Sequence, residues 1–203
     1  MSQATPSPSL SSYEQKLDKM VKVYPEKEII KGCKAGERKH QHALYERYHK
    51  KMYGVCLRYM TDPEMAQDML QEGFFKVFKN IHSCKGSGSL EGWVRRIVIH
   101  TCIEHLRRAQ KISFSGMEGV TARTTDLDAI SLLSHQEILH LIQQLPPGYR
   151  TVFNLYVVEG YTHPEISKLL NISVGTSKSQ LAKSKQHLRR LLNSCHIRIT
   201  QHA

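Results

Sequence analysis

Apolar residues recur at intervals of three and four along most of the chain, and this spacing predicts amphipathic helices. Three long stripes of this kind lie at about 38–60, 63–81 and 90–110. Two shorter stripes follow at about 132–145 and 149–159. The sequence lacks the sustained alternation of apolar and polar residues that would predict a half-buried strand. The pattern therefore predicts an all-α protein.

A polar stretch without an apolar period separates these helices into two groups. Residues 111–131 mix Ser, Thr, Gly and Asp, a composition typical of a flexible interdomain linker. We therefore expect two small helical domains joined by a flexible linker. The expected divisions are a disordered or weakly structured extension at 1–24, an N-terminal domain at 25–110, the linker at 111–131, a C-terminal domain at 132–195 and a tail at 196–203.

Two short helical patterns with separate start signals lie close together in the C-terminal domain. Thr162 and Glu165 have the spacing of a capping box, in which each side chain accepts a hydrogen bond from the other residue's backbone N–H. Asn171 and Ile172 supply a tight turn, and Ser173 can cap the next helix. This arrangement predicts a helix-turn-helix, a motif whose second helix can enter the major groove of DNA.

The charge of the chain supports an anionic partner. It has 29 Lys and Arg residues against 18 Asp and Glu residues, for a net charge of +11, and no acidic residue follows Glu165. A helical hairpin with a merely solvated basic face is the simpler alternative. The residues expected to reach DNA bases and phosphates from the second helix are Ser173, Gly175, Thr176, Lys178, Ser179 and Lys183.

Other features of the composition exclude several classes of protein. The sequence has no apolar run near the eighteen residues that a membrane helix needs, and its start does not have a signal-peptide pattern, so we expect a cytoplasmic protein without membrane insertion. The five cysteines are irregularly spaced and predict reduced thiols. Cys102 and His105 are three residues apart, but no matched set of four ligands accompanies them. We expect neither a metal site nor a cofactor.

Four segments of the chain resemble a known family. Residues 166–179 resemble the C-terminal DNA-binding domain of bacterial RNA polymerase sigma factors, and residues 145–153 extend that match. Independently, residues 68–78 are similar to the polymerase-binding helix of the sigma N-terminal domain, and residues 93–108 are similar to the promoter-reading helix that follows it. Both matches occur in the family's order and spacing. The lack of a long middle region resembles the short extracytoplasmic-function (ECF) group.

The resemblance implies a function and assigns residues to it. It implies a non-catalytic factor, monomeric when free, that binds core RNA polymerase and promoter DNA and helps to open that DNA. The resemblance also implies a further possible partner, an anti-sigma factor. Asp68, Gln71 and Glu72 match the polymerase-binding positions. The residues that could neutralise phosphates around the opened minus-ten strand are Lys85, Arg95, Arg96, Arg107 and Arg108.

Some residues depart from the family pattern. His100, Ser177 and Gln180 are such departures, and they fall in the DNA-reading helices, so we transfer no promoter sequence. Trp93 could stack on an unpaired base, but a lone Trp among apolar helix positions is more simply a core residue.

Two alternatives from other classes remain at this stage. One is a conventional helix-turn-helix regulator, whose N-terminal helices dimerise or sense a ligand and which binds a palindromic site without polymerase. The other is a DNA recombinase or nuclease with a helix-turn-helix tail, in which carboxylates bind a metal ion. The carboxylates considered for that role are Asp62, Glu64, Asp68 and Glu72.

Overall fold

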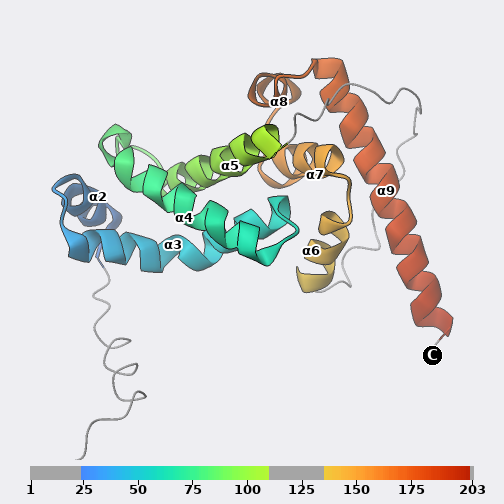
Figure 1. Cartoon of the computed structure of the whole chain (residues 1–203), viewed down its shortest axis with the longest axis horizontal. Helices are drawn as coiled ribbons and strands as arrows, with labels where there is room; N and C mark the ends of the chain where they lie inside the picture. The colour runs from blue at the N-terminus through green and yellow to red at the C-terminus, as the bar shows by residue number, and fades with distance from the viewer. Residues whose placement is uncertain (1–23, 110–134, 202–203) are drawn as a thin grey trace, which may run out of the picture.

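The computed structural model describes residues 24–109 and 135–201, with side chains from 24 to 108 and from 136 to 193. Nearly all of the expected extension and linker lies outside the described residues. Every regular element within these ranges is helical, which confirms the all-α prediction (Figure 1). In chain order the elements are α2 (Glu26–Lys34), α3 (Arg38–Tyr59), α4 (Pro63–Lys79), the 3₁₀ turn η1 (Ile81–Ser83), α5 (Leu90–Ala109), α6 (His135–Gln143), α7 (Pro147–Phe153), the π-helical turn η3 (Asn154–Val158), α8 (His163–Leu170) and α9 (Val174–Gln201).

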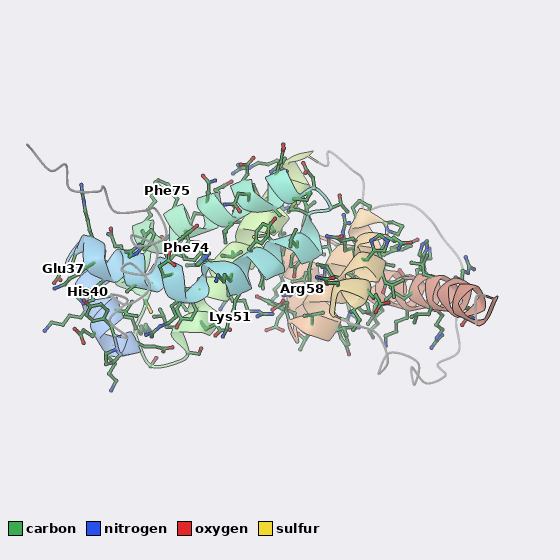
Figure 2. All side chains as sticks on the ribbon, turned by 90° about the horizontal axis from the view of Figure 1, so that it is seen from below. Glu37, His40, Lys51, Arg58, Phe74 and Phe75 are labelled. Atoms are coloured by element: carbon green, nitrogen blue, oxygen red, sulfur yellow. The ribbon has the colours of Figure 1, made fainter. Side chains whose placement is uncertain are left out.

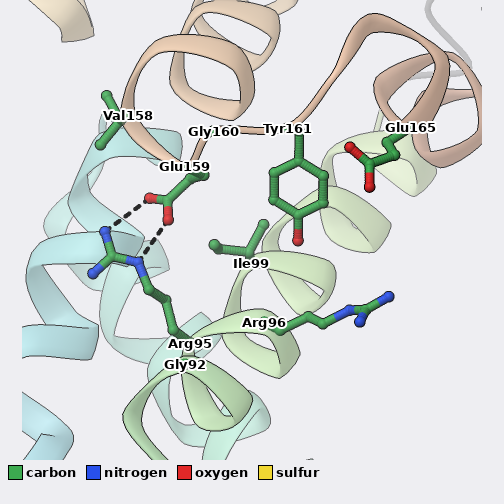
Figure 3. A pocket seen from close by; sticks show the side chains of 9 residues that line it. All are labelled: Gly92, Arg95, Arg96, Ile99, Val158, Glu159, Gly160, Tyr161 and Glu165. Atoms are coloured by element: carbon green, nitrogen blue, oxygen red, sulfur yellow. Dashed lines mark hydrogen bonds and ion pairs between the residues drawn. The ribbon is translucent and has the colours of Figure 1, made fainter. Parts of the chain in front are cut away.

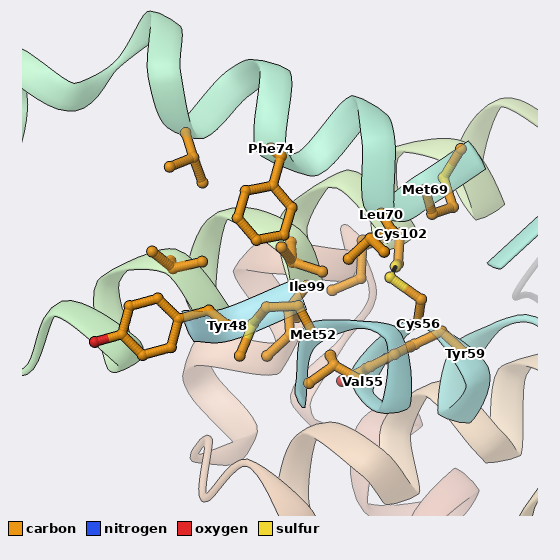
Figure 4. Packing of buried hydrophobic residues seen from close by; sticks show 14 of the residues in the cluster. Tyr48, Met52, Val55, Cys56, Tyr59, Met69, Leu70, Phe74, Ile99 and Cys102 are labelled. Atoms are coloured by element: carbon orange, nitrogen blue, oxygen red, sulfur yellow. Dashed lines mark hydrogen bonds between the residues drawn. The ribbon is translucent and has the colours of Figure 1, made fainter. Parts of the chain in front are cut away.

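Helices α2 to α5, called here the N-terminal unit, form a bundle in which α3, α4 and α5 pack on one another and α2 packs on α3 (Figure 1). Asp62 starts α4, because its side chain accepts a hydrogen bond from the Glu64 N–H at 3.0 Å and Pro63 takes the first helical position. Gly73 allows α5 to approach closely, since a Cβ there would lie 3.0 Å from Val98 Cγ2. The three apolar stripes meet in the core of this bundle (Figure 4).

Helices α6 to α9, called here the C-terminal unit, are built around α9. Helices α6, α7 and α8 all contact it. On one side, Leu141 and Leu145 pack against Leu188 and Leu192 in a small separate cluster. None of the helices in the described part of the chain is long and apolar enough to cross a membrane.

The two units share one apolar core. Val152 and Leu155 of the C-terminal unit belong to the same cluster of buried residues as Tyr59 of α3. The last carbonyl groups of a helix have no partners within that helix, and the C-terminal unit supplies donors to two of them at the end of α3. Gln143 Nε2 donates to the Leu57 C=O at 2.9 Å, and Asn154 Nδ2 donates to the Arg58 C=O at 2.7 Å.

The turn η3 continues α7 with more residues per turn, as a π-helix does. In it the Glu159 N–H donates to the Asn154 C=O at 2.9 Å, five residues back. Such π-helical turns often mark functional positions. Here the turn ends directly before Glu159, whose side chain enters the interface between the two units.

Candidate polymerase and nucleic-acid interfaces

The helix-turn-helix begins with the capping box that the sequence predicts. The Glu165 N–H donates to Thr162 Oγ1 at 3.4 Å, and the Thr162 N–H donates to Glu165 Oε2 at 2.8 Å. This second bond is the largest influence that lowers the pKa of the Glu165 carboxyl group. Helix α8 ends at Asn171, whose φ of 55° lies in the left-handed region that Asn tolerates. The N-cap expected for α9 is also present, since the Thr176 N–H donates to Ser173 Oγ at 2.9 Å.

The residues predicted to contact DNA lie along the first turns of α9. Local hydrogen bonds hold the hydroxyl groups, because Ser173 Oγ and Thr176 Oγ1 are 2.8 Å apart and Ser179 Oγ donates to the Thr176 C=O at 3.0 Å. Lys178, the charged residue among those predicted on the first two turns of α9, is exposed. Of the predicted residues, Ser173, Gly175, Lys178 and Ser179 are exposed, and Thr176 and Lys183 are half-buried.

A polar contact that the sequence did not reveal joins α8 to α9. Ser177 is fully buried, and its Oγ lies 2.9 Å from His163 Nδ1. The Tyr156 ring stacks on the His163 ring with centroids 4.4 Å apart. Burial, and secondarily the charge of Lys178, lowers the pKa of His163, which favours the neutral imidazole. Ser177 departs from the family pattern in sequence, and in the structure its hydroxyl group links α9 to His163 of α8.

A groove of about 370 Å³ lies where the end of α4 and the turn η1 meet α5. Asn80, Trp93, Arg96 and His100 are among the side chains that line it. Trp93 is half-buried, and it both packs against the core and lines the groove. Burial is the main influence that lowers the pKa of His100. The groove thus combines an aromatic ring, the cation of Arg96, neutral polar groups and the Lys76–Glu104 ion pair.

The basic residues predicted around the opened DNA strand fall into two groups. Lys85, Arg96, Arg107 and Arg108 are exposed, as phosphate contacts need to be. Arg95 differs, since it is half-buried and forms an ion pair with Glu159 of the C-terminal unit.

Glu159 joins the two units through charge. Its carboxylate accepts hydrogen bonds from Arg95 Nε at 2.6 Å and Arg95 Nη2 at 3.0 Å, as Figure 3 shows, and from Arg58 Nη2 at 2.8 Å. The Glu159 side chain is only 4% exposed. The hydrogen bonds to Glu159 raise the pKa of Arg95 further. This cluster borders a cavity of about 480 Å³, which Arg96, Tyr161 and Glu165 also line.

The face of α4 that the sequence assigns to polymerase is continued by an exposed apolar residue one helical turn further along the helix. Asp68 and Gln71 are exposed, and Phe75, one helical turn beyond Gln71, is 67% exposed and points away from the bundle (Figure 2). Its neighbour Phe74 is buried in the core. The sequence contained a signal for this, because Phe74 continues the apolar stripe of Leu70 and Val77 at intervals of four and three residues, whereas Phe75 lies beside that stripe.

Glu72 takes part in a second ion-pair network. Lys76 Nζ lies 2.8 Å from Glu72 Oε1 and 2.8 Å from Glu104 Oε2, so it joins α4 to α5. The hydrogen bond from Lys76 is the main influence that lowers the pKa of Glu104. Glu72 therefore has a structural role beside the polymerase contact that the sequence predicts for it.

The metal-dependent alternative finds no support in this geometry. Asp62 caps α4 and Glu72 binds Lys76, and within the described residues no group of three or more His, Cys, Asp or Glu side chains could hold a metal ion. Cys56 Sγ and Cys102 Sγ lie 3.9 Å apart in the core (Figure 4). Their hydrogen bond, and then burial, raises the pKa of Cys102, so this thiol is held protonated.

Comparison with known proteins assigns both units to one family. Residues 44–112 match Sigma-70 region 2, and residues 135–188 match Sigma-70 region 4. The two matches lie on the two helical units and together cover more than half of the chain. The chain therefore belongs to the sigma-70 family of RNA polymerase sigma factors, and it directs promoter-specific initiation of transcription with RNA polymerase.

Its relatives place it in the ECF group. It is 29% identical to the ECF RNA polymerase sigma factor SigW of Bacillus subtilis over 179 residues, which cover 82% of this chain and 96% of that protein. It is 27% identical to the RNA polymerase sigma-H factor of Pseudomonas aeruginosa, over 82% of this chain and 93% of that protein. Among solved structures, the sigma factor RpoE in complex with the anti-sigma factor NepR from Bartonella quintana is 16% identical, with a TM-score of 0.49 over 73% of this chain and 94% of that one.

Proposed function

We propose that this sigma factor divides its work among three surfaces. The exposed face of α4 binds core polymerase, the groove between α4 and α5 receives the opened minus-ten strand, and the first turns of α9 bind the minus-thirty-five element. The free chain is a cytoplasmic monomer with no catalytic activity of its own, because RNA synthesis belongs to the polymerase. An anti-sigma protein remains a predicted partner.

The observation that carries this division is the difference in chemistry between the exposed surfaces of the two family-matched segments. The α4 face is polar and acidic around an apolar side chain, with Asp68, Gln71 and Phe75 in line along the helix. Such a mixed face, with one aromatic anchor, is typical of a protein interface. By contrast, Lys178 and Arg96 project from basic, exposed helix surfaces suited to phosphates.

An unpaired base that leaves the stack loses roughly a few kcal/mol of stacking energy, and the pocket that binds it must compensate for this loss. The groove beside Trp93 and His100 offers an aromatic edge and neutral polar groups, and the Glu104 carboxylate in its lining is paired with Lys76. Exposed Arg96 at its rim can hold the adjacent phosphate. These features support the minus-ten assignment of this part of α5.

Two variants separate the polymerase surface from the DNA surface. Lys178→Ala should weaken promoter binding by the holoenzyme at least about five-fold and reduce the salt slope by about one, with core polymerase affinity unchanged. The double variant Asp68→Ala, Gln71→Ala should reduce polymerase affinity instead. Both are measured by titration of labelled sigma factor with core polymerase and by promoter-DNA binding of the preformed holoenzyme.

Lys50→Ala is the matched control, since Lys50 is an exposed residue of α3 outside all three surfaces. Loss of polymerase affinity in Lys178→Ala, with a normal circular dichroism spectrum, would contradict the division of labour. Run-off transcription from a genomic promoter library then identifies the promoters that the holoenzyme uses.

A further inference from the structure

The buried charges between the two units consist of one carboxylate and two guanidinium groups. Glu159 comes from the C-terminal unit, whereas Arg58 lies in the last turn of α3 and Arg95 lies on α5. The side chains of Arg58 and Arg95 are 15% and 31% exposed, so both are largely withdrawn from water. The site therefore has one more positive charge than negative, and both cations are aimed at a single anionic group.

An oxygen pair held by two guanidinium groups is also the usual arrangement around a phosphate. Arg95 donates two bonds to the Glu159 carboxylate through Nε and Nη2, in the forked geometry with which arginine binds carboxylate or phosphate. Arg58 adds a third bond from a different helix. These two arginines of the N-terminal unit therefore form a preorganised anion site. While the two units are docked, Glu159 of the C-terminal unit occupies it.

The docked arrangement of the two units, called here the closed chain, cannot bind both promoter elements at once. This argument rests on the proposed function. Minus-ten and minus-thirty-five elements are about 25 base pairs apart, or about 85 Å along B-form DNA at about 3.4 Å per base pair. In the closed chain, Tyr161 at the start of the helix-turn-helix lines the same cavity as Arg95 and Arg96 (Figure 3). The two DNA-binding surfaces are therefore held together in one compact body, and the units must separate before both elements are bound.

We propose that Arg58 and Arg95 form a binding site for a backbone phosphate of the opened promoter strand, and that Glu159 occupies this site while the units are docked. Docking and minus-ten binding then exclude each other, so the chain limits its own binding to DNA. Separation returns all three charges to water or to DNA. Arg58 gains a role that the sequence motifs do not assign to it.

Glu159→Gln tests this competition, because it keeps the shape of the side chain and removes its charge. The probe is a fluorescein-labelled single-stranded DNA of mixed sequence, titrated with the full chain by fluorescence anisotropy at several salt concentrations. We expect Glu159→Gln to bind it at least about five-fold more tightly, because the open state is more populated. Hydrogen exchange should become faster at the end of α3 and in η3. Glu28→Gln is the matched control, since it removes the same charge from an exposed position on α2.

Arg58 distinguishes a phosphate site from a purely structural bridge. In the Glu159→Gln background, Arg58→Ala should weaken DNA binding several-fold and lower the salt slope by about one, and Arg58→Lys should keep most of that slope. If Arg58→Ala leaves the affinity and slope of the Glu159→Gln chain unchanged, Arg58 is only a structural partner and the proposed site is wrong.

The proposed function has a separate readout. Promoter-specific run-off transcription by the unaltered chain with core polymerase tests it independently of Glu159. Transcription by that chain, together with unchanged DNA affinity and hydrogen exchange in Glu159→Gln, overturns the competition and leaves the proposed function intact. Absence of promoter-specific transcription overturns the proposed function itself.

Discussion

At the scale of single residues, two helical glycines have opposite surroundings. A Cβ on Gly32 of α2 would clash with Nδ1 of the buried His40 ring, which is itself 3.0 Å from Glu37 Oε2. A Cβ on Gly54 of α3 would meet nothing within 4 Å. Close contact between α2 and α3 thus depends on a missing side chain at Gly32, whereas Gly54 only weakens its helix.

Alanine substitutions at these positions should therefore change stability in opposite directions. We expect Gly32→Ala to lower the free energy of unfolding by about 1–3 kcal/mol through overpacking against His40. Gly54→Ala should raise it by about 0.5–1 kcal/mol, because alanine favours the helix. Urea denaturation followed by circular dichroism measures both. Equal stabilisation by the two substitutions would show that His40 does not occupy the space beside Gly32.

At the scale of elements, α4 carries two adjacent phenylalanines with different tasks. Phe74 is 3% exposed and its ring makes an edge contact with the Tyr45 ring, with centroids 4.8 Å apart, whereas Phe75 is 67% exposed.

Phe74→Ala should lower the free energy of unfolding by about 3–5 kcal/mol, as large-to-small changes in a core do. Phe75→Ala should leave stability within about 0.5 kcal/mol of the original and weaken polymerase binding. Thermal unfolding and titration with core polymerase measure the two effects. Normal polymerase affinity in Phe75→Ala would remove this residue from the interface.

The start signals of elements were predictable because they depend on neighbours in sequence. The Asp62 cap, the Thr162–Glu165 capping box and the Ser173 cap all involve residues two or three positions apart. Periodicity likewise indicated the stripes that form the core. Hydrogen bonds and ion pairs between elements were not predictable in this way. Glu72 looked like a surface residue in the sequence, and its link through Lys76 to Glu104 depends on how α4 and α5 are packed.

At the scale of the whole molecule, the docking of the two units could not be predicted from the sequence. The pattern indicated two domains and a polar stretch between them, and it contained no sign of a shared interface. Arg58 and Glu159 are 101 positions apart in sequence, and Arg95 and Glu159 are 64 apart. Such contacts depend on the relative placement of complete units, which short-range spacing does not encode. Arg95 was therefore expected to be open to DNA, whereas it is bound to Glu159.

The same interface should make the chain unfold as one cooperative unit, since the apolar core continues from Tyr59 to Leu155. The double variant Gln143→Ala, Asn154→Ala removes the donors to the last carbonyl groups of α3 and should weaken docking by about 1–3 kcal/mol. Differential scanning calorimetry of the full chain should then resolve two transitions in place of one. A single transition at a lower temperature would mean that the units remain docked until they unfold. In that case opening would require a bound partner, because thermal separation alone would not expose the DNA-binding surfaces.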